Sequence, residues 1–201
     1  LQKYSEAANA YHRVITLKPQ TFQAYNELGK IYAIENKHSD ALSMFERALM
    51  INPQYLEATI NIACLNKDLN QLIELQKQNP ARGDIAYNIA KIYHTQKLDE
   101  QALAQAMNAA RLYPCEEYCL FCADLLSQSN QTTEALKYYH QTLEYNPNSV
   151  SALINIANNT PDSAKAEKIY KSALSISPKN FDAHLNYAVL LHKQNRLNEA
   201  L

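Results

Sequence analysis

Three cysteines lie close together in the segment PCEEYCLFC, near the middle of this chain. Cys115, Cys119 and Cys122 form a C-x3-C-x2-C array, and cysteine thiolates at such short spacings can hold an iron–sulfur cluster. A cluster would make this segment the centre of a redox or radical enzyme. The alternative is that the cysteines fill a core, because a buried cysteine packs like a small hydrophobic residue. The segment alone does not distinguish these interpretations, so the elements around it must.

Other candidates for chemistry are weaker. The 6 histidines show neither the H-E-x-x-H nor the H-x3–5-H spacing of a zinc site. The acid pairs Asp99–Glu100 and Glu116–Glu117 could act as acid and base. Each pair, however, lies at a predicted helix start, where carboxylates interact favourably with the positive end of the helix dipole. We therefore expect no catalytic residue, no metal site, no cofactor and no enzymatic activity in this chain.

Glycine is scarce, with 2 glycines in 201 residues where an average chain of this length has about 14. Phosphate-binding loops, nucleotide-binding turns and nucleophile elbows need glycine where the backbone bends sharply or lies against a ligand. These site classes are therefore excluded. No Asn-Gly or Asp-Gly hairpin turn occurs either, so the pattern favours an all-helical protein.

Charge and hydropathy limit the partners. The net charge is −1 and no run of Lys or Arg occurs, so we expect no nucleic-acid partner. No stretch of about 18 apolar residues is present, so we expect no direct membrane insertion. Without a secretory signal or a disulfide framework we expect an intracellular, cytoplasmic location, while the oligomeric state stays open. The chain begins with Leu1 rather than Met, so we expect a piece of a longer protein.

Prolines recur at a regular interval along the chain. Each ends a helical pattern such as ALSMFERALMINP, because proline lacks the amide that a helix interior needs. The separations are 34, 27, 34, 33 and 31 residues, between Pro19, Pro53, Pro80, Pro114, Pro147 and Pro178. A period of this length indicates stacked helical repeats.

The best unit, residues 22–55, resembles the tetratricopeptide repeat, a helix–turn–helix of 34 residues. The matching residues are Tyr25, Leu28, Gly29 and Tyr32 in the first helix, and Ala41, Phe45, Ala48 and Pro53 in and after the second. The residue at position eight of the repeat is small in every unit with a first helix, because the two helices of a unit cross closely there. These residues are Gly29, Ala63, Ala90, Ala123, Ala157 and Ala188. The resemblance implies an all-α fold, a right-handed α-α superhelix (solenoid) of stacked helix–turn–helix units.

The whole chain then divides into units of one array. We expect helices at about 56–67 and 69–79 in the short unit. In a second shortened unit we expect a break at Asn158–Pro161, with Asp162 or Ser163 capping the next helix. The units are a partial repeat at 1–21 (second helix only), a repeat at 22–55, a short degenerate repeat at 56–82, repeats at 83–115 and 116–148, a shortened repeat at 149–180 and a partial repeat at 181–201, with Ala200 and Leu201 starting its second helix.

The cysteines can now be interpreted. The alignment puts Cys119 and Cys122 at first-helix positions four and seven, which Tyr25 and Leu28 hold elsewhere. These are core positions, and residues three apart share one helix face. We therefore interpret the array as core and predict no metal.

In this family the first helices line a concave groove that binds extended or helical segments of partner proteins. Position six is asparagine in four units, and an amide that both donates and accepts can hold a peptide backbone. This resembles the asparagine ladder of protein O-GlcNAc transferases, although a structural role for these asparagines stays open. We expect the peptide-binding residues to be Asn61, Asn88, Asn155, Asn186, Lys30, Lys91, Tyr87, Phe121 and His94.

Three functions follow from the resemblance. The first is a non-catalytic scaffold that binds a polypeptide segment in the groove. The second is the substrate-recruiting region of a larger enzyme, such as a protein O-GlcNAc transferase. The third is an architectural subunit of a large assembly. A chaperone-tail clamp is not expected, because no arginine lies at the matching positions.

Overall fold

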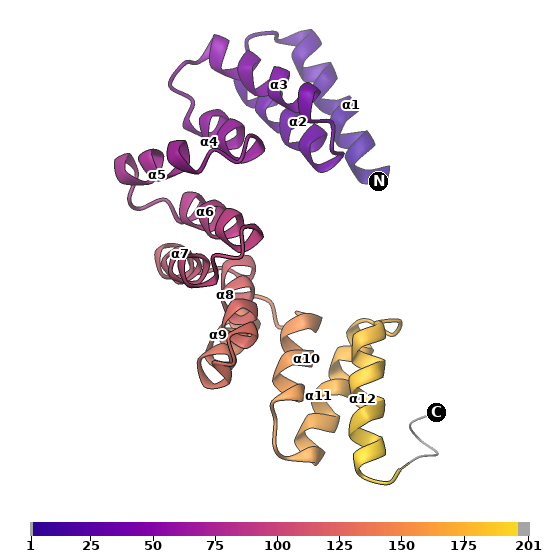
Figure 1. Ribbon diagram of the computed structural model, residues 1–201. Helices are drawn as coiled ribbons and strands as arrows, with labels where there is room; N and C mark the ends of the chain where they lie inside the picture. The colour runs from indigo at the N-terminus through magenta and orange to yellow at the C-terminus, as the bar shows by residue number, and fades with distance from the viewer. Residues whose placement is uncertain (1, 197–201) are drawn as a thin grey trace. The chain divides into compact units, whose positions relative to one another are not determined.

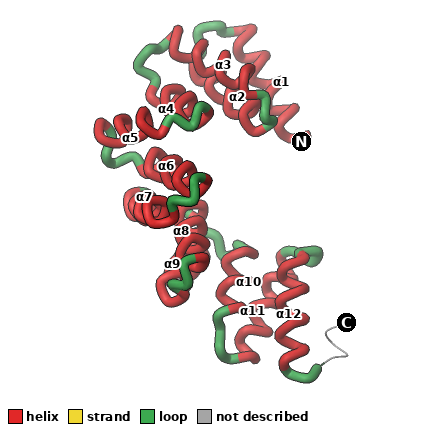
Figure 2. The backbone as a smooth tube through the Cα atoms, viewed as in Figure 1, coloured by secondary structure: helices red, strands yellow, loops and turns green. Residues whose placement is uncertain are grey.

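The computed structural model describes residues 2–196, which form helices joined by short loops (Figures 1 and 2). No strand occurs in that range, so the predicted all-α repeat architecture is confirmed. The predicted start of another second helix, at Ala200 and Leu201, lies outside the described residues. The helices are α1 (Gln2–Leu17), α2 (Phe22–Ile34), α3 (His38–Ile51), α4 (Leu56–Leu65), α5 (Leu69–Gln78), α6 (Gly83–Thr95), α7 (Asp99–Leu112), α8 (Glu116–Gln128), α9 (Thr132–Tyr145), α10 (Val150–Asn158), α11 (Ser163–Ile176) and α12 (Phe181–Lys193).

The sequence signals place the helix ends correctly. The short unit holds two helices, α4 and α5, close to the predicted ranges. The shortened unit breaks between α10 and α11, where the Asp162 carboxylate accepts hydrogen bonds from the backbone N–H groups of Ala164 (2.9 Å) and Lys165 (3.2 Å). The two acid pairs lie in the first turns of α7 and α8. The exact repeat boundaries stay a prediction.

Most of the turns after the first helices share one backbone feature. A residue with positive φ follows the first helices α2, α4, α6, α8 and α12, but not α10, and none of these residues is glycine. This conformation commonly ends helices. These residues lie in the loops drawn in green in Figure 2. They are Asn36 (φ 59°), Lys67 (53°), Lys97 (62°), Asn130 (58°) and Asn195 (57°).

The chain divides into two compact units, Leu1–Pro80 and Ala81–Leu201. In the first unit, α2 packs on α3 around the fully buried Phe45 ring. A Cβ on Gly29 would lie 2.6 Å from Phe45 Cε1 and 3.1 Å from the Ala41 carbonyl oxygen. The helices therefore cross closely at position eight, as predicted.

In the second unit, α6 to α10 contribute buried residues to one core cluster and α10 to α12 to another. Cys122, Leu126 and Tyr139 belong to the first cluster, and Ile154 and Tyr170 to the second. Within the described residues, no helix is long and apolar enough to cross a membrane.

The core interpretation of the cysteines is confirmed for two of the three. Cys119 and Cys122 are fully buried, and burial raises their pKa values to about 11 and about 12. Both are therefore protonated thiols at neutral pH. Cys115 is only half-buried, because it precedes α8 as its N-cap residue. Among residues 2–196, no group of three or more His, Cys, Asp or Glu side chains is placed to hold a metal ion.

Candidate peptide-binding surface

Aromatic side chains of α6 and α8 gather on one surface of the second unit. Tyr87 and Lys91 lie one turn apart on α6, and Tyr118 and Phe121 lie one turn apart on α8, so each pair shares a helix face. Helices α6 and α8 are the first helices of neighbouring repeats, so these two faces lie next to each other. We call this set the aromatic surface: Tyr87, Tyr113, Tyr118, Phe121, His94 and the ammonium of Lys91.

The rings of the aromatic surface contact one another directly. Tyr87 stacks on Tyr118 with centroids 4.6 Å apart and an interplanar angle of 26°. The Phe121 ring meets Tyr87 edge-on at 5.4 Å and His94 edge-on at 5.9 Å. Tyr113 adds a further edge contact to Tyr118 at 6.5 Å and is 66% exposed. Offset-stacked and edge-on pairs of this kind are favourable, so the rings form an ordered platform.

The platform carries one cation and neutral phenols. Lys91 Nζ lies 5.2 Å from the centroid of the Tyr87 ring, a cation–π geometry. Burial, followed by a hydrogen bond to Glu117, raises the pKa of Tyr87 well above its ordinary value. Burial, followed by the Asp84 charge, raises the pKa of Tyr118 to about 12. Both phenols are therefore hydrogen-bond donors at neutral pH and not phenolates.

An ion pair borders the platform. Arg82 donates to both Asp84 oxygens, with Nε–Oδ1 at 2.8 Å and Nη2–Oδ2 at 2.7 Å. This bidentate contact, the largest influence on the Asp84 carboxyl, lowers its pKa. Asp84 is thus ionised near neutral pH, so the border is polar while the platform is apolar. That combination is typical of protein interfaces.

The predicted residues of the first unit form a different arrangement. Asn61 Nδ2 donates to Asn26 Oδ1 at 2.8 Å, and Asn26 Nδ2 donates to Glu27 Oε1 at 3.2 Å. Lys30 Nζ then lies 2.9 Å from Glu27 Oε2. Asn26 is 2% exposed. The amide of Asn61 is therefore engaged inside the unit, which agrees with the structural role left open above.

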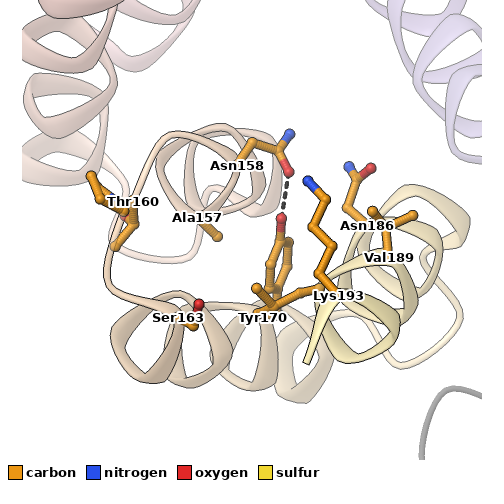
Figure 3. A pocket seen from close by; sticks show the side chains of 10 residues that line it. Ala157, Asn158, Thr160, Ser163, Tyr170, Asn186, Val189 and Lys193 are labelled. Carbon is orange, nitrogen blue, oxygen red and sulfur yellow. Dashed lines mark hydrogen bonds between the residues drawn. The ribbon is translucent and has the colours of Figure 1, made fainter. Parts of the chain in front are cut away.

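The three remaining predicted asparagines lie on three first helices of the second unit. Asn88, Asn155 and Asn186 are half-buried on α6, α10 and α12. In α8 the equivalent position holds Phe121, which belongs to the aromatic surface. Asn186 instead lines a pocket of about 410 Å³ formed by α10, α11 and α12 (Figure 3).

Four members of the aromatic surface are therefore predictable from the repeat pattern, whereas Tyr113 and Tyr118 are not. Tyr118 is at first-helix position three, outside the positions that face a groove in this family. Tyr113 follows the last residue of α7 as its C-cap. The one signal for Tyr113 was its place directly before the stop proline Pro114.

Comparisons with known proteins agree with this architecture. Family models of the tetratricopeptide repeat match residues 1–55, 119–151 and 162–201. Human Protein O-mannosyl-transferase TMTC3 is 23% identical over 216 residues, which cover 100% of this chain and 24% of that protein. The chain thus spans about a quarter of the length of this curated relative.

Solved structures share the fold at low identity. The crystal structure of yeast Tom70 superimposes with a TM-score of 0.79 at 18% identity, covering 94% of this chain and 43% of that chain. The crystal structure of YrrB, described as a TPR protein with an unusual peptide-binding site, gives a TM-score of 0.52 at 17% identity, covering 96% of this chain and 88% of that chain. From its repeated helix pairs, its small residues at the crossings and these three sequence matches, the chain belongs to the tetratricopeptide repeat family.

Proposed function

We propose that this chain is a non-catalytic interaction module that binds a segment of a partner polypeptide through its first helices. The aromatic surface of α6 and α8 is the main contact. The observation that carries this proposal is the stacked, half-exposed ring set Tyr87, Tyr118 and Phe121 with Lys91 beside it. Aromatic residues contribute most of the binding energy at many protein interfaces, because they bury large areas at little entropic cost.

The chemistry of the surface indicates the kind of segment. Flat rings suit apolar side chains, and the neutral Tyr118 O–H group can donate to a backbone carbonyl, whereas the Tyr87 O–H group is directed at Glu117. A nucleic acid would need more cations than Lys91 supplies here, since phosphate contacts dominate such binding. The fold of YrrB, described by its peptide-binding site, supports a polypeptide partner.

Selection of random 12-residue peptides against the purified chain tests this proposal. We expect peptides rich in apolar residues, and we expect Tyr118→Ala/Phe121→Ala to weaken their binding by about tenfold or more, as truncation of interface hot spots does. Tyr145→Ala is the matched control, because Tyr145 is 47% exposed on α9 and lies outside the aromatic surface. Full affinity in a folded double variant would refute the assignment.

A second candidate is that the chain recruits substrates for a larger transferase. The similarity to TMTC3 over the whole chain supports it. Glycosyl transfer by the full-length protein to a protein acceptor would then fall in Tyr118→Ala/Phe121→Ala through a higher KM. Transfer to a short acceptor that does not reach the aromatic surface would be unchanged. Equal effects on both acceptors would contradict this role.

A further inference from the structure

The aromatic surface continues past the first helices onto the turn between α7 and α8. Tyr113 lies in this turn as the C-cap residue of α7, with non-helical backbone angles (φ −144°, ψ 83°), and it is 66% exposed. A Cβ on Gly83 would lie 3.2 Å from Tyr113 Cβ, so the glycine at the start of α6 leaves room for Tyr113 to lie against that helix. The Tyr113 ring then meets Tyr118 edge-on. The exposed rings therefore extend beyond the positions that face a groove in this family.

The rings follow one another at short and similar intervals. Their centroids lie 6.5 Å apart from Tyr113 to Tyr118, 4.6 Å from Tyr118 to Tyr87, and 5.4 Å from Tyr87 to Phe121. The polyproline II helix is an extended conformation that rises about 3.1 Å per residue. About two residues of such a helix cover the distance from one ring to the next, so a segment that crosses the surface can contact a new ring at every second residue.

The polar groups beside the tyrosines offer hydrogen-bond donors to a ligand. The Tyr118 hydroxyl is protonated at neutral pH, and the Lys91 ammonium carries three N–H groups. The carboxylates in the first turns of α6 and α8, by contrast, already accept hydrogen bonds within the protein. Their donors are Arg82 for both oxygens of Asp84, Asn146 Nδ2 for Glu116 Oε1 at 2.7 Å, and the Tyr87 hydroxyl for Glu117.

This balance of donors and acceptors favours one kind of backbone. An ordinary extended peptide carries an N–H at every residue, and an N–H that is desolvated against the rings without an acceptor weakens binding. Proline has a carbonyl but no N–H, so a proline-rich segment brings acceptors for Tyr118 and Lys91 and no donor that stays unpaired. Proline also fixes φ, so such a segment loses little conformational freedom when it binds.

We infer that the aromatic surface binds a proline-rich segment of a partner protein in the polyproline II conformation. Proline rings pack on Tyr113, Tyr118 and Phe121, and a backbone carbonyl accepts from the Tyr118 hydroxyl. The inference deepens the proposed function and rests on it for binding at this surface. A helical segment fits less well, because its carbonyls are used in its own hydrogen bonds and it would leave the Tyr118 hydroxyl without an acceptor.

The test is a nuclear magnetic resonance titration of the 201-residue chain with three blocked peptides. They are N-acetyl-decaproline amide, the same peptide with alanine at every second position, and a helical peptide of alanine, leucine and lysine. We expect decaproline to shift the signals of Tyr113, Tyr118 and Phe121. We expect it to bind about tenfold more tightly than the alanine-substituted peptide, which restores N–H groups that find no acceptor, and than the helical peptide.

Variants separate the hydroxyl from the rings. Tyr118→Phe keeps the ring and removes the donor, so the affinity for decaproline should fall about fivefold, the scale of one hydrogen bond. Tyr113→Ala removes an exposed ring and should weaken binding by a similar factor. Tyr145→Ala is the matched control, because Tyr145 is 47% exposed outside the aromatic surface. Equal binding of decaproline and the alanine-substituted peptide, tighter binding of the helical peptide, no binding of decaproline, or full affinity in both variants would each overturn the inference.

This outcome is distinguishable from that of the proposed function. If peptides selected at random depend on Tyr118 and Phe121 but decaproline does not bind, the inference about proline fails and the proposed function stands. If the selected peptides keep full affinity in the folded Tyr118→Ala/Phe121→Ala variant, the proposed function fails at this surface whatever decaproline does.

Discussion

Asp124 on α8 shows how one buried polar contact ties a helix pair together. It accepts a hydrogen bond from the Tyr139 hydroxyl of α9 at 2.8 Å, and Tyr139 is 1% exposed. Burial raises the pKa of Asp124 above its ordinary 3.8, and the Tyr139 bond offsets part of that rise. The folded state therefore holds the Asp124 proton to higher pH than the unfolded state does.

This difference in proton binding predicts a pH dependence. Between pH 3.8 and the raised pKa the folded protein binds more protons, so the contribution of Asp124 to stability is lost as pH rises through that window. Asp124→Asn cannot titrate but still accepts from Tyr139. We expect its unfolding free energy to gain on that of the parent protein as pH rises from 4 to 7, measured by urea denaturation. Parallel curves would contradict the assignment.

Gly29 tests the close crossing of α2 and α3. In Gly29→Ala the new methyl group must displace the buried Phe45 ring and approaches the Ala41 carbonyl. Overpacking costs roughly 1–3 kcal/mol and the gain in helix propensity returns about 1 kcal/mol, so we expect a net loss of roughly 1 kcal/mol in the free energy of unfolding. Adding Phe45→Leu should relieve the clash, so the double variant should lose less than the two single losses combined. Additive losses would argue against contact.

At the scale of elements, α4 and α5 show how a repeat seven residues short of its neighbour still folds. Asp68 precedes α5 as its N-cap residue, and its carboxylate accepts from the Gln71 backbone N–H at 3.0 Å. The fully buried Leu72 then anchors α5 in the first unit. One cap and one apolar anchor thus replace the usual pair of an alanine and an aromatic residue.

Removing the cap should loosen α5. Asp68→Ala leaves the Gln71 N–H without its side-chain acceptor, and we expect a loss of about 1 kcal/mol in the free energy of unfolding. Asp68→Asn keeps an accepting oxygen and should differ little from the parent protein. Hydrogen exchange of the α5 amides gives the local measurement, and equal protection in all three proteins would contradict it.

Helix ends and core positions were predictable because they depend on local chemistry. Prolines stop helices and short polar side chains cap them, so the break before Asp162 could be placed without coordinates. The burial of Cys119 and Cys122 followed from their register. The Asn61–Asn26 bond and the Tyr87–Tyr118 stack could not be predicted, since they depend on how side chains of different helices meet.

At the scale of the whole molecule, each compact unit carries its own buried clusters. Phe45 and Ala48 belong to the cluster of Leu1–Pro80, whereas Cys122, Tyr139 and Tyr170 belong to clusters of Ala81–Leu201. Repeat proteins gain stability chiefly from contacts between neighbouring repeats. The aromatic surface and the pocket formed by α10, α11 and α12 both lie within Ala81–Leu201.

We therefore expect a fragment of residues 81–201 to fold alone. It should show a helical circular dichroism spectrum, unfold cooperatively and keep the peptide affinity of the full chain. A fragment of residues 99–201 is the matched control, because it removes α6, whose buried Ala90 packs in one cluster with Ala102 and Ala106 of α7. That shorter fragment should lose Tyr87 and its peptide binding. A disordered 81–201 fragment would contradict the independence of the unit.

The left-handed residues after the first helices have a practical consequence. Lysine and asparagine hold a backbone conformation there that costs an L-residue roughly 1–2 kcal/mol and costs glycine far less. Replacing Lys67 or Lys97 with glycine should therefore increase the free energy of unfolding. A more stable version of this protein could thus be made by changing its turns alone, with the helices left as they are.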